Sequence, residues 1–217
     1  MRTEELIARL GGAVTPVKPL ASPVRRLLLW LAWVVPVLAV IVAAMGLHPD
    51  VPERWADPRW ATQIIASALT GLCAAWAALA STVPGISRWR LALPVPPALV
   101  WLGSVGLGCL NDWVVRGADS LLPAIKPQCL PEITVISIAP LAVLVILSRR
   151  GAALRPHLTA CLTALAAAAL ASAVLDQVHR ADAAIVTLVW HFGGVALLSG
   201  LATLFGRRLF PAPMIRR

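Results

Sequence analysis

The sequence has little charge, few acidic residues and no tyrosine. Only 13% of its 217 residues are charged, ten residues are acidic, and 59% are hydrophobic, whereas an ordinary soluble domain carries about 25% charged residues. A single water-soluble core could not hide this much apolar surface, because a small domain buries only part of its chain. The shortage of charge excludes a soluble enzyme, a disordered tail and a disulfide-rich secreted module. A polytopic membrane protein remains.

Six stretches of the chain are free of charge. A membrane-spanning helix needs about 20 mostly apolar residues, and each stretch comes close to or exceeds that length. The stretches are Leu27–Leu47, Trp60–Val83, Leu91–Leu110, Ile133–Ser148, Leu158–Leu175 and Ala183–Phe205. The predicted fold is an all-α bundle of six transmembrane helices. The fifth helix is rich in small residues, which let membrane helices approach closely, so we expect it near the centre.

The basic residues predict the orientation of this bundle. Cytoplasmic loops carry an excess of Lys and Arg, and with the N-terminus inside 14 of the 19 basic residues face the cytoplasm. An even number of spans then places both termini in the cytoplasm. This orientation accounts for the net charge of +9, so no direct contact with nucleic acid is needed to explain it. Three regions follow: a cytoplasmic arm (1–26), a transmembrane domain (27–205) and a basic cytoplasmic tail (206–217).

No signal peptide is recognisable before the first span. Residues 1–26 are too polar to form the apolar region of such a peptide. We therefore expect the first span to be a retained helix.

His191 is the only ionisable residue predicted at mid-depth of a span, where it follows Trp190. It could serve as a proton relay or a ligand contact, or it could be a neutral imidazole bonded within the bundle. The second interpretation is favoured, because no acidic residue is predicted at its depth. The lack of other intramembrane charges argues against a small transporter or channel, which remains the alternative function.

Motifs of catalysis are absent from the sequence. No Ser/His/Asp set, phosphate loop or HExxH motif is recognisable. We therefore expect no enzymatic activity, no cofactor and no resident metal.

Nine tryptophans accompany the absence of tyrosine. Trp30 and Trp33 fall near the inner end of the first span, as expected of an interfacial aromatic belt. Trp76, Trp101 and Trp190 fall deeper and are expected to pack inside the bundle.

The predicted arm begins with a short helix over residues 3–10. Leu6, Ile7 and Leu10 share one face of it by helical spacing, and two glycines end it. Such a helix can lie on a membrane surface or dock into a groove on a cytoplasmic partner. Both interpretations stay open at this point.

Two cysteines fall at the outer face. Cys109 closes the third span and Cys129 precedes the fourth, and residues 110–128 can fold back to bring them together. A structural disulfide or a redox-active pair is favoured over unrelated thiols. A soft metal held with His48 or His179 is an alternative, although the spacing matches no standard zinc pattern. The two other cysteines lie inside spans and are expected to be apolar fillers.

Several short blocks in a fixed order resemble the NrsF family, membrane-bound negative regulators of a sigma factor. The blocks are Met1-Arg2-Thr3-Glu4-Glu5-Leu6-Ile7, residues 23–26, residues 56–59, Gly108-Cys109-Leu110-Asn111-Asp112-Trp113, residues 149–156 and Leu188-Val189-Trp190-His191. Together they cover essentially the whole chain.

This resemblance implies an anti-sigma factor in the bacterial inner membrane. It would hold an extracytoplasmic-function sigma factor and release it on an envelope, oxidative or metal stress signal. Cys109 and Cys129 would be the sensing candidates. The sigma-binding surface would be cytoplasmic, and Leu6, Ile7 and Leu10 are the candidate contacts. The implied partners are the sigma factor and the lipid bilayer.

Overall fold

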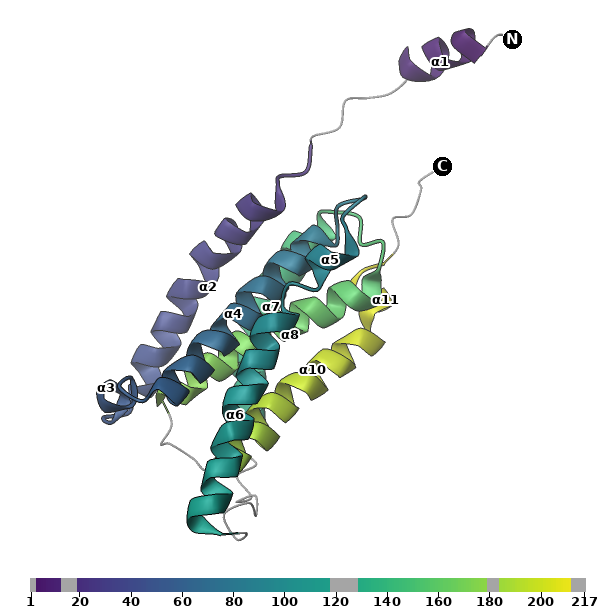
Figure 1. Cartoon of the computed structure of the whole chain (residues 1–217). Coiled ribbons are helices and arrows are strands. Elements are labelled where there is room, and N and C mark those ends of the chain that lie inside the picture. The colour runs from purple at the N-terminus through teal and green to yellow at the C-terminus, as the bar shows by residue number, and fades with distance from the viewer. Residues whose placement is uncertain (1–2, 13–18, 118–128, 179–183, 212–217) are drawn as a thin grey trace.

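The structure is a computed structural model that describes residues 3–12, 19–117, 129–178 and 184–211. Every regular element in this part of the chain is a helix, and six helices are long and apolar enough to cross a membrane. They form one bundle (Figure 1). The prediction of an all-α fold with six spanning helices is therefore confirmed.

All six predicted spans have a counterpart in the bundle. The first five are α2 (Pro23–Met45), α4 (Pro58–Ala80), α6 (Val95–Arg116), α7 (Cys129–Arg149) and α8 (Pro156–Val178). The sixth consists of α9 (Ala184–Val186), a π-helical turn η2 (Thr187–Phe192) and α10 (Gly193–Leu204). The short helices are α1 (Thr3–Gly12), α3 (Val51–Arg54), α5 (Arg88–Leu91) and α11 (Gly206–Leu209). The helices α6 and α8 extend beyond the predicted ends, and this difference shapes the site described below.

Local sequence signals account for where the long helices begin. Pro23 and Pro58 occupy the first turns of α2 and α4, where the missing N–H of proline costs nothing. The side chain of Ser22 caps α2 by accepting from the backbone N–H of Arg25 at 3.3 Å, and Asp57 caps α4 in the same way. These polar side chains satisfy backbone donors that a helix start leaves open.

The alanine-rich helix α8 lies at the centre, as predicted for the fifth span. It is the most buried of the six long helices and packs against α4, α7 and α10. A Cβ on Gly71 of α4 would come within 2.8 Å of Cγ of Leu170 on α8. Small residues thus permit the close backbone approach that holds membrane helices together.

The bundle has two distinct ends. The end at which α2 begins is called the arm end. The helices α5 and α11 also lie at this end, and α1 stands apart beyond it (Figure 1). We call the opposite end, where α3 lies, the pocket end.

At the arm end, Arg26 ties three helices together. Its side chain is buried, with 2% exposed, and its guanidinium donates to the carbonyl of Leu79 on α4 at 2.8 Å. It also donates to Thr82 Oγ1 at 3.1 Å and to the carbonyl of Leu147 on α7 at 3.4 Å. The last carbonyls of a helix lack partners within the helix, so a cation there is favourable. Arg26 therefore fastens α2 to the ends of α4 and α7.

The expected interfacial position of Trp30 is wrong. Trp30 is fully buried, and its indole N–H donates to the carbonyl of Pro140 on α7 at 2.9 Å. Arg26, Trp30 and Val34 are spaced four residues apart and form the buried stripe of α2. Trp33, on the other side of the helix, is exposed as predicted.

The first residues of the predicted tail pack against the bundle. Phe210 follows α11 and is buried against Val145 and Ala160. The close approach of Gly206 to the backbone of His157 leaves no room for a side chain, with a Cβ at 2.7 Å from the His157 Cα. Residues 212–217 lie outside the described part.

Candidate functional site

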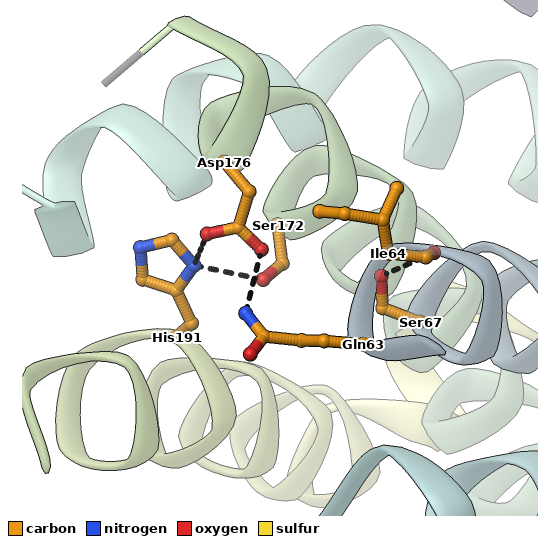
Figure 2. Close-up of polar contacts among 6 residues, drawn as sticks. All are labelled: Gln63, Ile64, Ser67, Ser172, Asp176 and His191. Carbon is orange, nitrogen blue, oxygen red and sulfur yellow. Dashed lines mark hydrogen bonds and ion pairs between the residues drawn. The ribbon is translucent and has the colours of Figure 1, made fainter. Parts of the chain in front are cut away.

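A buried pair of a histidine and an aspartate lies in the half of the bundle nearer the pocket end. Nδ1 of His191 in η2 lies 3.1 Å from Oδ1 of Asp176 on α8, with 6% and 9% of the two side chains exposed (Figure 2). The expectation that no acidic residue lies at the depth of His191 is wrong. It failed because α8 continues past Leu175 to Val178 and carries Asp176 inward instead of ending before it.

Two further side chains complete the cluster. Ser172 Oγ lies 3.0 Å from the same Nδ1 of His191, and the amide of Gln63 on α4 donates to Oδ2 of Asp176 at 3.2 Å (Figure 2). The two oxygens of the Asp176 carboxyl group thus have different partners, the imidazole of His191 and the amide of Gln63. The cluster joins α4, α8 and η2 through polar contacts.

Ser172, Asp176 and His191 meet although the sequence suggests no such set, but their geometry is not that of a catalytic triad. In a triad the serine and the carboxylate contact opposite nitrogens of the imidazole, so that a proton can pass across the ring. Here both contact Nδ1. The arrangement holds the orientation of His191.

The backbone that carries His191 is itself unusual. Residues 187–192 form a π-helical turn, and the N–H of Gly193 donates to the carbonyl of Leu188 five residues earlier. Such turns are rare and occur frequently at functional sites. The wider turn also moves the side chains of η2 relative to those of α10.

A pocket of about 240 Å³ connects this cluster with the surface at the pocket end. His191 and Asp176 lie in its wall, together with residues from α3, α4, α6 and the start of α9. The other charged or amide side chains of the wall are Arg54, Asp57, Arg59, Gln63, Asp112 and Arg116. Polar groups thus converge on a space large enough for a small molecule.

One side of the pocket borders an apolar cluster. Val105 of the pocket wall belongs to this cluster, together with the buried residues Ala66, Trp101, Ala168 and Val195. In the described part of the chain the pocket walls do not continue toward the arm end.

The predicted sensing cysteines can be placed only in part. Cys109 is a half-buried free thiol on α6, next to Gly108 of the pocket wall. Cys129 is the first residue of α7, and its side chain lies outside the described part, so the predicted pairing remains a prediction. Among the described residues no group of three or more His, Cys, Asp and Glu is arranged to hold a metal. His179, the alternative ligand, also lies outside them.

Of the remaining predicted site residues, those on α1 lie far from this pocket and Trp190 lies beside it. Leu6 and Ile7 on α1 are exposed, at 40% and 64%; the side chain of Leu10 lies outside the described part. Trp190 is half-buried next to His191 but does not line the pocket. It packs against the hydrophobic cluster that contains Trp101 and Val195, as expected of a deep tryptophan.

Sequence reasoning missed Asp176, Gln63 and the arginines of the pocket mouth. One signal was available: Ser172 and Asp176 are four residues apart and therefore share a face of α8. The partnership with His191 depends on the packing of η2 against α8, which no local pattern encodes.

The fold and the site define a class: a polytopic helical membrane protein with a polar pocket at one end and an apolar-faced helix beyond the other. The family comparison specifies it further. The NrsF family, described as "Negative regulator of sigma F", matches residues 10–211, and the chain belongs to this family. No curated protein and no solved structure matched the chain.

Proposed function

We propose that this protein is a membrane-bound anti-sigma factor that sequesters an extracytoplasmic-function sigma factor and releases it on an envelope, oxidative or metal stress signal. The match of nearly the whole chain to the NrsF family carries this proposal. No chemical reaction is assigned to the chain.

The proposed orientation places the arm end in the cytoplasm of a bacterial inner membrane. Arg25, Arg88, Arg90, Arg150 and Arg207 are exposed there, in agreement with the excess of positive charge on cytoplasmic loops. The pocket end then faces outward. A signal at the outer face and a sigma factor at the inner face would be on opposite sides of the membrane.

The helix α1 is the proposed contact for the sigma factor. It stands apart from the bundle (Figure 1), and Leu6 and Ile7 are exposed on it. A short apolar helical face can dock into a groove on a partner protein. The acidic Glu4 and Glu5 in its first turn stabilise the helix start.

Two helices connect the proposed signal site with the proposed docking side. At the pocket end α4 and α8 carry Gln63 and Asp176; toward the arm end Ser81 Oγ lies 2.8 Å from Thr159 Oγ1 on the same two helices. Arg26 then fastens the end of α4 to α2, the helix that follows the arm. A shift between α4 and α8 would therefore reach the arm, as transmission between two sites requires.

The retention of a sigma factor tests the proposal. The full-length protein is purified from its native membrane with a C-terminal tag, and bound proteins are identified. We expect a sigma factor to co-purify, and Ile7→Asp to lower its retention roughly tenfold or more, because a charge would enter an apolar interface. The matched control Glu4→Gln, on the same exposed helix, should retain it. A wild-type protein that retains no sigma factor would contradict the proposed function.

The orientation has its own test. Intact cells are treated with a thiol reagent that does not cross the membrane, and labelling of Cys109 and Cys129 is compared with labelling after permeabilisation. The proposed orientation predicts labelling of Cys129 in intact, reduced cells. Reaction only after permeabilisation would reverse the orientation.

A further inference from the structure

The mouth of the pocket is formed by arginines from three different elements. Arg54 lies on α3, Arg59 at the start of α4 and Arg116 at the end of α6. Among the described residues, Arg59 and Arg116 each make one long contact to an aspartate near it in sequence. Arg59 Nε lies 3.9 Å from Asp57 and Arg116 Nε 3.7 Å from Asp112.

These two contacts leave the guanidinium forks available. Both use Nε, and the terminal amino groups of Arg59 and Arg116 have no partner among the described residues. Exposed ion pairs of this length contribute little to stability. The aspartates therefore orient the arginines without occupying the donors that bind a carboxylate or phosphate group in bidentate fashion.

The deeper wall of the pocket is rigid and already satisfied. Asp112 accepts from the backbone N–H of Ala184 at 3.1 Å, and Asp176 accepts from Gln63 and lies against His191. The deeper wall thus contains two carboxylates that already have partners, whereas Arg59 and Arg116 lie at the mouth. An anionic group of a small solute would therefore be favoured at the mouth, beside the arginines.

We propose that the pocket binds an oxyanion, a phosphate or carboxylate group, between Arg59 of α4 and Arg116 of α6. A bound oxyanion would contact both guanidiniums and so bridge the start of α4 and the end of α6. The volume of about 240 Å³ is smaller than the roughly 300–1,000 Å³ of sites for drug-sized ligands, in keeping with a metabolite-sized group. Binding is independent of sigma-factor sequestration, but any effect of binding on regulation rests on the proposed function.

The probe is inorganic phosphate added to the full-length protein in a detergent that contains no phosphate. Thermal unfolding is followed against sodium chloride at equal ionic strength, with succinate in parallel as a carboxylate probe. We expect a saturable rise of the midpoint with phosphate or succinate. The double variant Arg59→Gln/Arg116→Gln should lose this rise.

Two controls test whether the response depends on these two arginines. Arg88→Gln removes an exposed arginine at the arm end and should respond like the wild type. Arg59→Lys/Arg116→Lys keeps the charge but loses the planar fork, so its affinity should fall roughly tenfold. The side chains of Arg59 and Arg116 are both more than half exposed, and the unliganded variants should therefore unfold at the wild-type midpoint.

The same experiment also identifies the source of the oxyanion. A phospholipid that co-purifies with the wild type, is lost in the glutamine variant and is displaced by phosphate assigns the group to a lipid headgroup. A phosphate response without a bound lipid assigns it to a soluble solute. A wild type that responds to phosphate and succinate no more than to chloride overturns the proposal, as does an equal response of the glutamine variant.

Discussion

The two ends of this bundle use polar side chains in opposite ways. At the arm end the buried cation Arg26 binds backbone carbonyls and fastens three helices. At the pocket end the charged groups surround a space: Asp176 and His191 lie in its wall, and Arg59 and Arg116 at its mouth have only long ion pairs. One end is built for fixed geometry, and the other retains polar groups that a ligand could engage.

This difference extends to how α2 is held. Its buried residues are Arg26, Trp30 and Val34, all in the half toward the arm end. Its other half contributes only partly buried residues, such as Leu38 and Ile41. The helix that follows the arm is thus attached where the arm emerges, so the arm end should dominate stability and the pocket end should dominate response.

The largest loss of stability is expected from Arg26→Ala. It leaves buried carbonyls of α4 and α7 without their donor and removes the packing of the side-chain stem, at a cost of about 3 kcal/mol in the free energy of unfolding. Equilibrium unfolding in detergent measures this cost. The neighbouring Arg25 is exposed, and Arg25→Ala should change stability by less than about 0.5 kcal/mol. Equal effects of the two variants would refute a fastening role of Arg26.

A smaller effect is expected from the buried pair at the pocket end. A double-mutant cycle of Asp176→Asn and His191→Phe should give a coupling energy of about 1–2 kcal/mol, since the two side chains share a hydrogen bond away from water. The matched cycle is Asp57→Asn with Arg59→Gln, whose pair is exposed and should couple by less than about 0.5 kcal/mol. Asparagine still caps α4 in that control. Coupling of the same size in both cycles would show that burial of the pair has no energetic consequence.

A third variant tests the attachment of α2 between the two ends. Trp30→Phe keeps the aromatic packing but removes the hydrogen bond to the carbonyl of Pro140, so we expect a loss of about 1 kcal/mol. Trp33→Phe, on the exposed side of the same helix, is the control and should be neutral. The comparison is measured by the same unfolding assay, and an equal loss in both variants would argue against the buried contact.

The sequence predicts the architecture well because the membrane constrains it strongly. A run of about 20 apolar residues has few alternatives to a spanning helix, and the small residues of α8 correctly predict its central position. Charge alone does not predict where a helix ends. Arg26 and Asp176 were taken as boundaries of the apolar stretches, yet both lie within helices and are buried by partners distant in sequence.

The candidate site shows the same limit more clearly. His191 stands out because it is alone in its span, but its partners Ser172 and Asp176 come from α8, which only tertiary packing brings near. The pocket is lined by residues from six elements, and its arginines look like ordinary loop charges in the sequence. Trp30 was misplaced for the same reason: a tryptophan near a helix end fits both an interfacial belt and a core, and only the proximity of Pro140 distinguishes them.

The smallest effect on stability is expected from Cys109→Ser. This variant also tests the contrast between the two ends most directly. Cys109 is half-buried on α6 beside the pocket wall, and replacing one sulfur by oxygen there should cost less than about 1 kcal/mol.

If Cys109 senses an oxidative or metal signal, the variant should keep the sigma factor bound when the signal arrives, while protein abundance stays normal. A sigma-dependent reporter and an immunoblot measure the two quantities, with Cys73→Ser, a cysteine within α4, as the control. Loss of the protein itself would make Cys109 structural, and an unchanged response would remove it from sensing. Either result would leave the polar pocket as the part of this end that can receive a signal.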